Sequence, residues 1–143
     1  MITKYAGLRA EGVNIEAGLE YCGNEDDFYR TLLSEYVKGA EEKRKELEEL
    51  FEKQDWKRYA IIVHALKGTS RMIGAISLSE TAKTLQDAAD LGEEEILNSR
   101  HGELLGSYAS LVGAIRKELG PEGQGETEQA GEKDGIFEFF PEG

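Results

Sequence analysis

The chain has 143 residues, a length that suits one domain with a single hydrophobic core. Its formal net charge is −12, and because nucleic-acid binding needs a basic surface, this charge argues against a nucleic-acid partner. No N-terminal apolar run resembles a signal peptide or a membrane span, and the single cysteine, Cys22, cannot form an intrachain disulfide. We therefore expect a cytoplasmic protein without a membrane partner, in which Cys22 is a small buried residue rather than a reactive thiol.

The distribution of proline predicts an all-helical body. Prolines occur only at positions 121 and 141, so residues 1–120 hold none of the residues that most strongly break helices. Residues 1–13 show no clear period, and we expect a flexible lead-in there. A short helix is predicted over residues 14–22, with Asn14 as its N-cap and Gly23 at the left-handed position after its end.

Two long helices should follow. Asn24 can cap the first, which has acids in its first turn and an apolar repeat of three and four residues up to about Lys53. Asp55 can cap the second, which should run from Trp56 to about Ile73. The short connection between the two helices predicts that they pack antiparallel.

Two further helices complete the predicted bundle. Ser77 and Glu80 form a capping-box pattern at the start of one helix, which should end near Gly92. The last helix should span residues 94–119 and place His101 in a core position, where packing with a hydrogen bond is expected rather than chemistry. Three glycines in this helix are expected at a close helix contact: Gly102, Gly106 and Gly113. The expected fold is all-α, an antiparallel up-down-up-down four-helix bundle with a short extra N-terminal helix.

The composition changes after the expected bundle, which we place at residues 14–119. Residues 120–143 are rich in glycine and glutamate without a period, which predicts an acidic flexible tail. Residues 136–140 within this tail hold four large apolar side chains. That apolar segment can bind the groove of a partner, fold back onto the bundle or begin the linker to a following domain, and the sequence leaves these alternatives open.

The candidate chemistry lies in residues 64–74. Residues three and four apart are neighbours on a helix, so Lys67, Gly68 and Arg71 share one face with His64. The other face has apolar residues at core spacing, so His64 should point away from the core. A neutral imidazole is a nucleophile near pH 7. A histidine beside a lysine is usually only a solvated surface, but a glycine in mid-helix costs about 0.5–1 kcal/mol relative to alanine, and Gly68 therefore favours a functional face.

The pattern His-x-Leu-Lys-Gly, followed six residues later by glycine, resembles the motif of histidine-phosphotransfer (HPt) domains of multistep phosphorelays. The matching residues are His64, Leu66, Lys67, Gly68 and Gly74. The resemblance covers roughly residues 14–117. It implies a phosphocarrier that accepts a phosphoryl group on His64 from a receiver-domain aspartate and passes it to another receiver, without kinase activity of its own.

The resemblance also implies roles for individual residues. Lys67 would pair with the phosphoryl oxygens, and Gly68 and Gly74 would keep the approach open for a bulky partner. Gln86, on the next helix, would hydrogen-bond the imidazole or the phosphoryl group, and Arg71 is a weaker candidate for stabilising the phosphoryl group. We expect no metal site and no cofactor within the chain, because the partner receiver would supply Mg²⁺. The expected partners are response-regulator receiver domains and a hybrid histidine kinase, and the chain itself is expected to be a monomer.

Two alternatives remain open at this point. The chain can be the phosphoacceptor part of a hybrid sensor histidine kinase, but the histidine of that family is usually followed by an acid and later a proline. Here Ala65 follows His64, and no proline occurs before Pro121. The chain can also be a helical adaptor without phosphotransfer, in which case His64 would be replaceable. Labelling by a phosphodonor distinguishes these interpretations.

Overall fold

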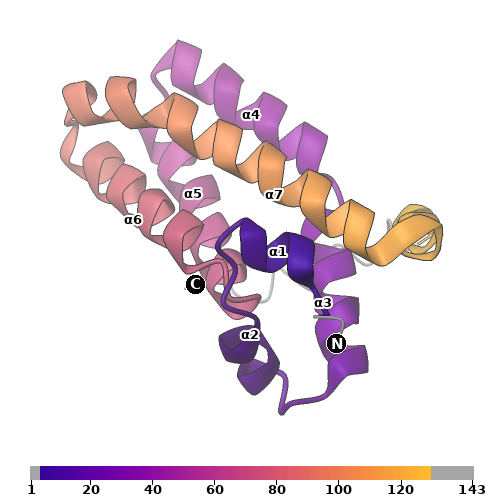
Figure 1. The fold of residues 1–143 in the computed structure, drawn as a ribbon. Helices are drawn as coiled ribbons and strands as arrows, with labels where there is room; N and C mark the ends of the chain where they lie inside the picture. The colour runs from indigo at the N-terminus through magenta and orange to yellow at the C-terminus, as the bar shows by residue number, and fades with distance from the viewer. Residues whose placement is uncertain (1–3, 130–143) are drawn as a thin grey trace.

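The computed structural model describes the backbone of residues 4–129 and the side chains of residues 4–120. Within these residues the chain forms helices and no strand (Figure 1), which confirms the expected all-α class. The helices are α1 (Ala6–Ala10), α2 (Ile15–Tyr21), α3 (Asp26–Val37), α4 (Ala40–Lys53), α5 (Trp56–Met72), α6 (Ile76–Leu91) and α7 (Glu94–Gln129). Among the helices described, none is both long and apolar enough to cross a membrane.

One hydrophobic core joins these helices. α5 packs along α6, α7 packs against both α3 and α6, and α4 contacts α5. Figure 1 shows α7 as the long helix that crosses the bundle from end to end. Burying a large apolar side chain stabilises the folded state by about 1.5–3 kcal/mol relative to leaving it exposed. The largest fully buried side chains come from all seven of these helices: Tyr29, Tyr59, Tyr108, Leu8, Ile15, Leu33, Leu47, Leu66, Leu85, Leu97 and Leu104, together with Ile73 just after α5.

The long helix expected from residue 24 to residue 53 is in fact two helices, α3 and α4. Lys38 is extended and Gly39 has a left-handed backbone with φ +69°, so the chain turns between Val37 and Ala40. Glycine adopts this conformation without the steric penalty of a side chain. The turn lets α3 pack against α7 while α4 packs against α5.

The N-terminal segment differs from the expected flexible lead-in. Residues 4–13 contain α1, which packs against α7, and Tyr5, Leu8 and Val13 of this segment are buried. The Tyr5 hydroxyl also donates a hydrogen bond to Asp26 at the start of α3. A helix of five residues is too short to show a period, so the sequence pattern did not reveal it.

Three expected helix boundaries are confirmed by their capping contacts. The side chain of Asn14 accepts a hydrogen bond from the Ala17 N–H at 3.0 Å, as an N-cap does. Asp55 accepts from the Arg58 N–H at 3.4 Å and caps α5 in the same way. Gly92 ends α6 in the left-handed conformation, with φ +71°.

Two other expected caps are wrong. Gly23 adopts the expected left-handed conformation, but Asn24 does so as well, with φ +62°, and it does not cap α3. The capping box at Ser77 is also absent, because α6 already begins at Ile76 with Ala75 before it, and no side chain caps this helix. At both places a tight turn decides the boundary, and the polar side chains lie one or two residues from the cap position.

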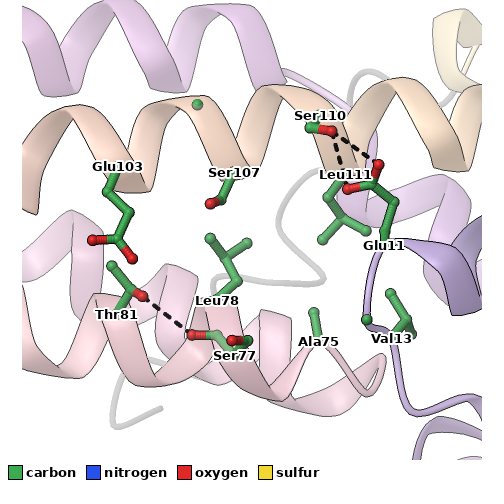
Figure 2. A pocket seen from close by; sticks show the side chains of 12 residues that line it. Glu11, Val13, Ala75, Ser77, Leu78, Thr81, Glu103, Ser107, Ser110 and Leu111 are labelled. Atoms are coloured by element: carbon green, nitrogen blue, oxygen red, sulfur yellow. Dashed lines mark hydrogen bonds between the residues drawn. The ribbon is translucent and has the colours of Figure 1, made fainter.

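The three glycines of α7 lie at no close helix contact, which corrects that expectation. Gly102, Gly106 and Gly113 are exposed, and a Cβ atom added at any of them would meet nothing within 4 Å. Gly106 lines a hollow of about 330 Å³ between α6 and α7. Figure 2 shows Ser107 of α7 facing Leu78 of α6 in this hollow. The three glycines therefore leave the outer face of α7 open and do not let another helix pack closely against it.

We predict that Gly106→Ala stabilises the chain by about 0.5–1 kcal/mol, because alanine loses less backbone entropy in a helix and fits the open space. Urea denaturation at neutral pH measures the change. Gly102→Ala is the matched variant and should show a gain of similar size. A loss of stability in either variant would mean that the outer face of α7 has a neighbour.

The end of α7 extends beyond the expected limit at Leu119. The helix continues to Gln129, although Gly120 has a non-helical backbone with φ +75° and ψ −171°. The expected tail therefore begins with helical residues. The rest of it, including the apolar residues 136–140, lies outside the described residues.

Candidate functional site

His64 lies in the middle of α5, and the burial of that helix determines which way it points. The opposite face of α5 is in the core, where Tyr59, Val63 and Ser70 are almost completely buried. The Ser70 hydroxyl shares a 2.7 Å hydrogen bond with the Tyr36 hydroxyl of α3, which fixes the rotation of α5 against its neighbour. His64 is half-buried as a result, at the edge of the outward face.

The two nitrogens of the His64 ring have different surroundings. Nδ1 is buried and has no hydrogen-bond partner among the described residues, whereas the residue as a whole is partly exposed. Nε2 is therefore the nitrogen that a partner can reach. A neutral imidazole protonated on Nδ1 carries its lone pair on Nε2, which is the arrangement a nucleophile needs.

The structure brings Lys67, Gly68 and Arg71 together with His64 on α5. Lys67 and Gly68 are half-buried and Arg71 is exposed one turn further on. In the part of the chain described, no carboxylate forms an ion pair with Lys67 or Arg71, so both cations can serve an incoming anion. The Ser79 hydroxyl of α6 donates to the Lys67 carbonyl at 2.9 Å and ties α6 to α5 at this level.

Gln86 lies on α6, the helix that packs along α5, and it is half-buried. Its Oε1 atom is buried and has no hydrogen-bond partner among the described residues. The structure forms no hydrogen bond between Gln86 and His64. Two buried polar atoms without partners, Oε1 of Gln86 and Nδ1 of His64, thus belong to neighbouring helices.

Gly74 is not on the His64 face, and its expected role in keeping the approach open is wrong. It lies in the turn after α5 with φ +91° and is buried. The Asn14 N–H donates to the Gly74 carbonyl at 2.8 Å, and a Cβ atom at Gly74 would overlap the Asn14 carbonyl oxygen. The absence of a side chain at Gly74 therefore lets the N-terminal segment pack against the end of α5.

An apolar groove beside His64 was missed by the sequence analysis. It has a volume of about 540 Å³ and lies between α5 and the turn that joins α3 to α4. Its apolar lining includes Ile61, Ile62, Ala65, Leu66, Tyr36 and Tyr108. Ile61 is 64% exposed, although it lies within one turn of His64. The sequence signal was this outward isoleucine, which does not belong to the core stripe of α5.

His101, the second histidine, is structural, as expected. It is buried, its Nδ1 lies 2.7 Å from the Tyr59 hydroxyl, and its ring stacks on Phe51 with the centroids 3.9 Å apart. Burial lowers the pKa of His101 below its ordinary value of 6.5, and the negative charge of Glu48 opposes this shift.

This lowered pKa predicts a pH dependence of stability. Between pH 6.5 and the lower folded pKa, the unfolded chain binds a proton that the folded chain does not bind. His101 therefore supports the fold above pH 6.5, and its contribution falls as the pH drops through this window. Urea denaturation should show that the free energy of unfolding of the wild type falls between about pH 7.5 and pH 5.5. The fall should be smaller in His101→Gln, because glutamine does not titrate. Equal losses in the two proteins would contradict the assignment.

The rest of the described chain offers no competing centre. Among residues 4–120, no three histidine, cysteine, aspartate or glutamate side chains lie close enough together to hold a metal ion. The hollow in Figure 2 is lined by small polar side chains, by Glu11 and Glu103 and by apolar residues such as Leu78 and Leu111, and none of the expected site residues borders it. The His64 face and its groove are therefore the candidate site.

Comparison with known proteins gives one match. The model of a protein family, described as Hpt domain, matches residues 31–119. This range contains α4, α5 and α6, and with them His64 and the groove beside it, whereas α1 and α2 precede it. No curated protein matches the chain, and no solved structure matches it.

Proposed function

Because this chain belongs to the Hpt domain family, we propose that it acts in a phosphorelay as a phosphocarrier with His64 as the acceptor. The observation that carries the proposal is the surface of α5 within the matched residues. There a half-buried imidazole keeps Nδ1 enclosed, and two cations without described ion pairs share its face. Such a face suits a group that accepts and releases a charged phosphoryl unit.

The chemistry follows from the exposed nitrogen. The Nε2 lone pair attacks the phosphorus of an aspartyl phosphate on a receiver domain, so that a P–N bond forms while the acyl P–O bond breaks. The electron pair of the broken bond stays with the departing carboxylate, and the proton on Nδ1 remains in place. The reverse steps deliver the phosphoryl group to an aspartate of a second receiver. This reaction depends on positioning and on neutralising charge more than on covalent assistance by the protein.

The neighbouring side chains have complementary roles in this proposal. Lys67 and, more weakly, Arg71 offset the negative charge of the phosphoryl oxygens. Gly68 leaves room above the helix for the receiver backbone. Gln86 accepts a hydrogen bond from the imidazole N–H through its Oε1, which is buried and has no partner among the described residues, or donates one from its amide N–H to the phosphoryl group. The receiver contributes Mg²⁺, and the chain works as a monomeric carrier without kinase activity.

The direct test is phosphate labelling of the full chain. A receiver phosphorylated on its aspartate, supplied with Mg²⁺, should transfer its phosphate to the chain. The label should be lost in acid and retained in alkali, and peptide mapping should place it on His64. A chain that stays unlabelled with a panel of phosphorylated receivers would instead support the adaptor alternative, in which the His64 face binds partners without chemistry.

Variants of the residues beside His64 should slow transfer without unfolding the bundle. Lys67→Ala removes one charge-assisted contact and should reduce the transfer rate about tenfold, which corresponds to about 1.4 kcal/mol. Gly68→Gln puts a long side chain next to the imidazole and should reduce the rate by at least about tenfold. Rapid-quench measurements of transfer report both rates.

Two remote variants are the controls for these rates. Lys117→Ala removes an exposed lysine from α7, and Gly102→Gln adds the same side chain at an exposed α7 glycine with open space around it. Both should transfer at the wild-type rate. If Lys67→Ala and Gly68→Gln also matched the wild type, the face of α5 would not be the site.

A further inference from the structure

The groove beside His64 has an apolar lining and an open rim. Its floor is formed by α5, by Tyr36 of α3 and by Tyr108 of α7, and its rim includes Ile61, a large aliphatic side chain that is 64% exposed. The lining also includes both lysines and glutamates, so charge does not select an occupant. The apolar lining selects the occupant instead, because a segment with several large apolar side chains gains the most free energy when it is buried there.

We propose that residues 136–140 of this same chain, Ile-Phe-Glu-Phe-Phe, dock into this groove. Four of these five side chains are large and apolar, and three of them are phenylalanine. An extended segment directs alternate side chains to opposite sides, so Ile136, Glu138 and Phe140 share one side and Phe137 and Phe139 the other. Phe137 and Phe139 enter the groove, and Glu138 stays at its rim.

The path of α7 brings this segment to the groove. Tyr108 of α7 lines the groove, and Arg116 donates to the Val37 carbonyl at 3.2 Å and to the Glu41 carboxylate at 3.1 Å. Val37 and Glu41 flank the turn that forms one wall of the groove. The chain therefore leaves the bundle beside the groove, one turn after Arg116.

The length of chain after the bundle permits the return. From Pro121 to Gln129, beyond the kink at Gly120, the helical rise of 1.5 Å per residue carries the chain about 12 Å away. From Gln129 to Ile136 the chain can span up to about 23–25 Å. The segment can thus come back to the groove, and the short link gives it an effective concentration on the order of millimolar. A weak apolar contact is then sufficient for docking.

Docking at this place affects access to His64, an effect that rests on the proposed function. Ile61 and Ala65 line the groove, and both lie within one turn of His64 on α5. A receiver that reaches Nε2 must cover the same part of the helix surface. The docked segment and the receiver therefore exclude each other, and the segment slows phosphoryl transfer.

Nuclear magnetic resonance of the full chain tests the docking itself. In the wild type, the backbone resonances of residues 136–140 should differ from those of a synthetic peptide of residues 132–143. The triple variant Phe137→Ser, Phe139→Ser, Phe140→Ser should shift the amide resonances of Ile61, Ala65 and Thr69. Identical segment resonances in the chain and the peptide would overturn the proposal, and so would groove resonances that the triple variant leaves unchanged.

A matched pair of surface variants locates the contact. Ile61→Glu places a charge on the groove rim, and Leu91→Glu places the same charge at an apolar residue, 72% exposed, that does not line the groove. Ile61→Glu should move the resonances of residues 136–140 toward those of the free peptide, and Leu91→Glu should leave them in place. Equal effects of the two variants would overturn the location. A dependence of these shifts on protein concentration would assign the groove to a second copy of the chain and would also overturn it.

Transfer rates test the effect on His64 separately. The triple serine variant should accept phosphate from a receiver at least about threefold faster than the wild type, whereas Glu132→Gln should match the wild type. Equal rates for the triple variant and the wild type would overturn the exclusion of the receiver. A chain that accepts no phosphate at all would refute the proposed function, while the resonances of the groove would still decide whether the segment docks.

Discussion

Replacing His64 by glutamine should abolish phosphate labelling and leave the bundle as stable as the wild type. The imidazole is half-buried, and no described residue forms a hydrogen bond with it, so its removal breaks no contact that holds the fold. Glutamine has a similar volume and a high helix propensity, so it suits the middle of α5. It has no nitrogen lone pair that can accept a phosphoryl group, and the loss of labelling should therefore be complete.

The second histidine provides the matched control for this experiment. His101→Gln removes the contact with the Tyr59 hydroxyl and the stacking on Phe51, and it leaves polar groups buried without their partners. It should lower the free energy of unfolding by about 1–3 kcal/mol and retain labelling at a temperature where it is folded. Circular dichroism melting and labelling are performed on both variants. His64→Gln should lose labelling and keep its stability, whereas His101→Gln should lose stability and keep its labelling. Persistent labelling of His64→Gln would refute the assignment of the acceptor.

The face of α5 could be predicted from the sequence because its geometry is local. Residues His64, Lys67, Gly68 and Arg71 belong to one helix, and a period of 3.6 residues fixes their relative directions without reference to any other segment. The buried stripe that orients the helix is likewise local, and Asp55 marks where the helix starts. The sequence therefore predicted which residues of α5 share a face with His64 and that this face points away from the core.

The remaining parts of the site depend on contacts between distant segments. The groove needs α3, α4 and α7 to meet α5, and the break that builds its wall depends on Gly39 turning left-handed. The apolar repeat continues through Gly39 into Ala40, so the pattern alone favours one unbroken helix. Gly74 shows the same limit, because its neighbour Asn14 is 60 residues away in the chain and no local rule connects them.

Gly74→Ala should be among the most destabilising single substitutions in this chain, lowering the free energy of unfolding by roughly 3–5 kcal/mol. An alanine held at φ +91° is strained by about 1–2 kcal/mol. Its Cβ atom would also overlap the Asn14 carbonyl oxygen, which belongs to the backbone and cannot rotate away. The start of α2 would have to move, at the expense of the 2.8 Å hydrogen bond from Asn14 to Gly74.

Gly92→Ala separates backbone strain from the packing of the N-terminal segment. Gly92 also has a left-handed backbone, with φ +71°, but a Cβ atom there meets nothing within 4 Å. This variant should lose only about 1–2 kcal/mol, the strain itself. The difference between the two variants, measured by urea denaturation, is then the contribution of the segment around Asn14, which precedes the family match at residues 31–119. Equal losses would mean that α2 does not pack on the end of α5, whereas a larger loss for Gly74→Ala would make the N-terminal helices part of the folding unit that holds His64 in place.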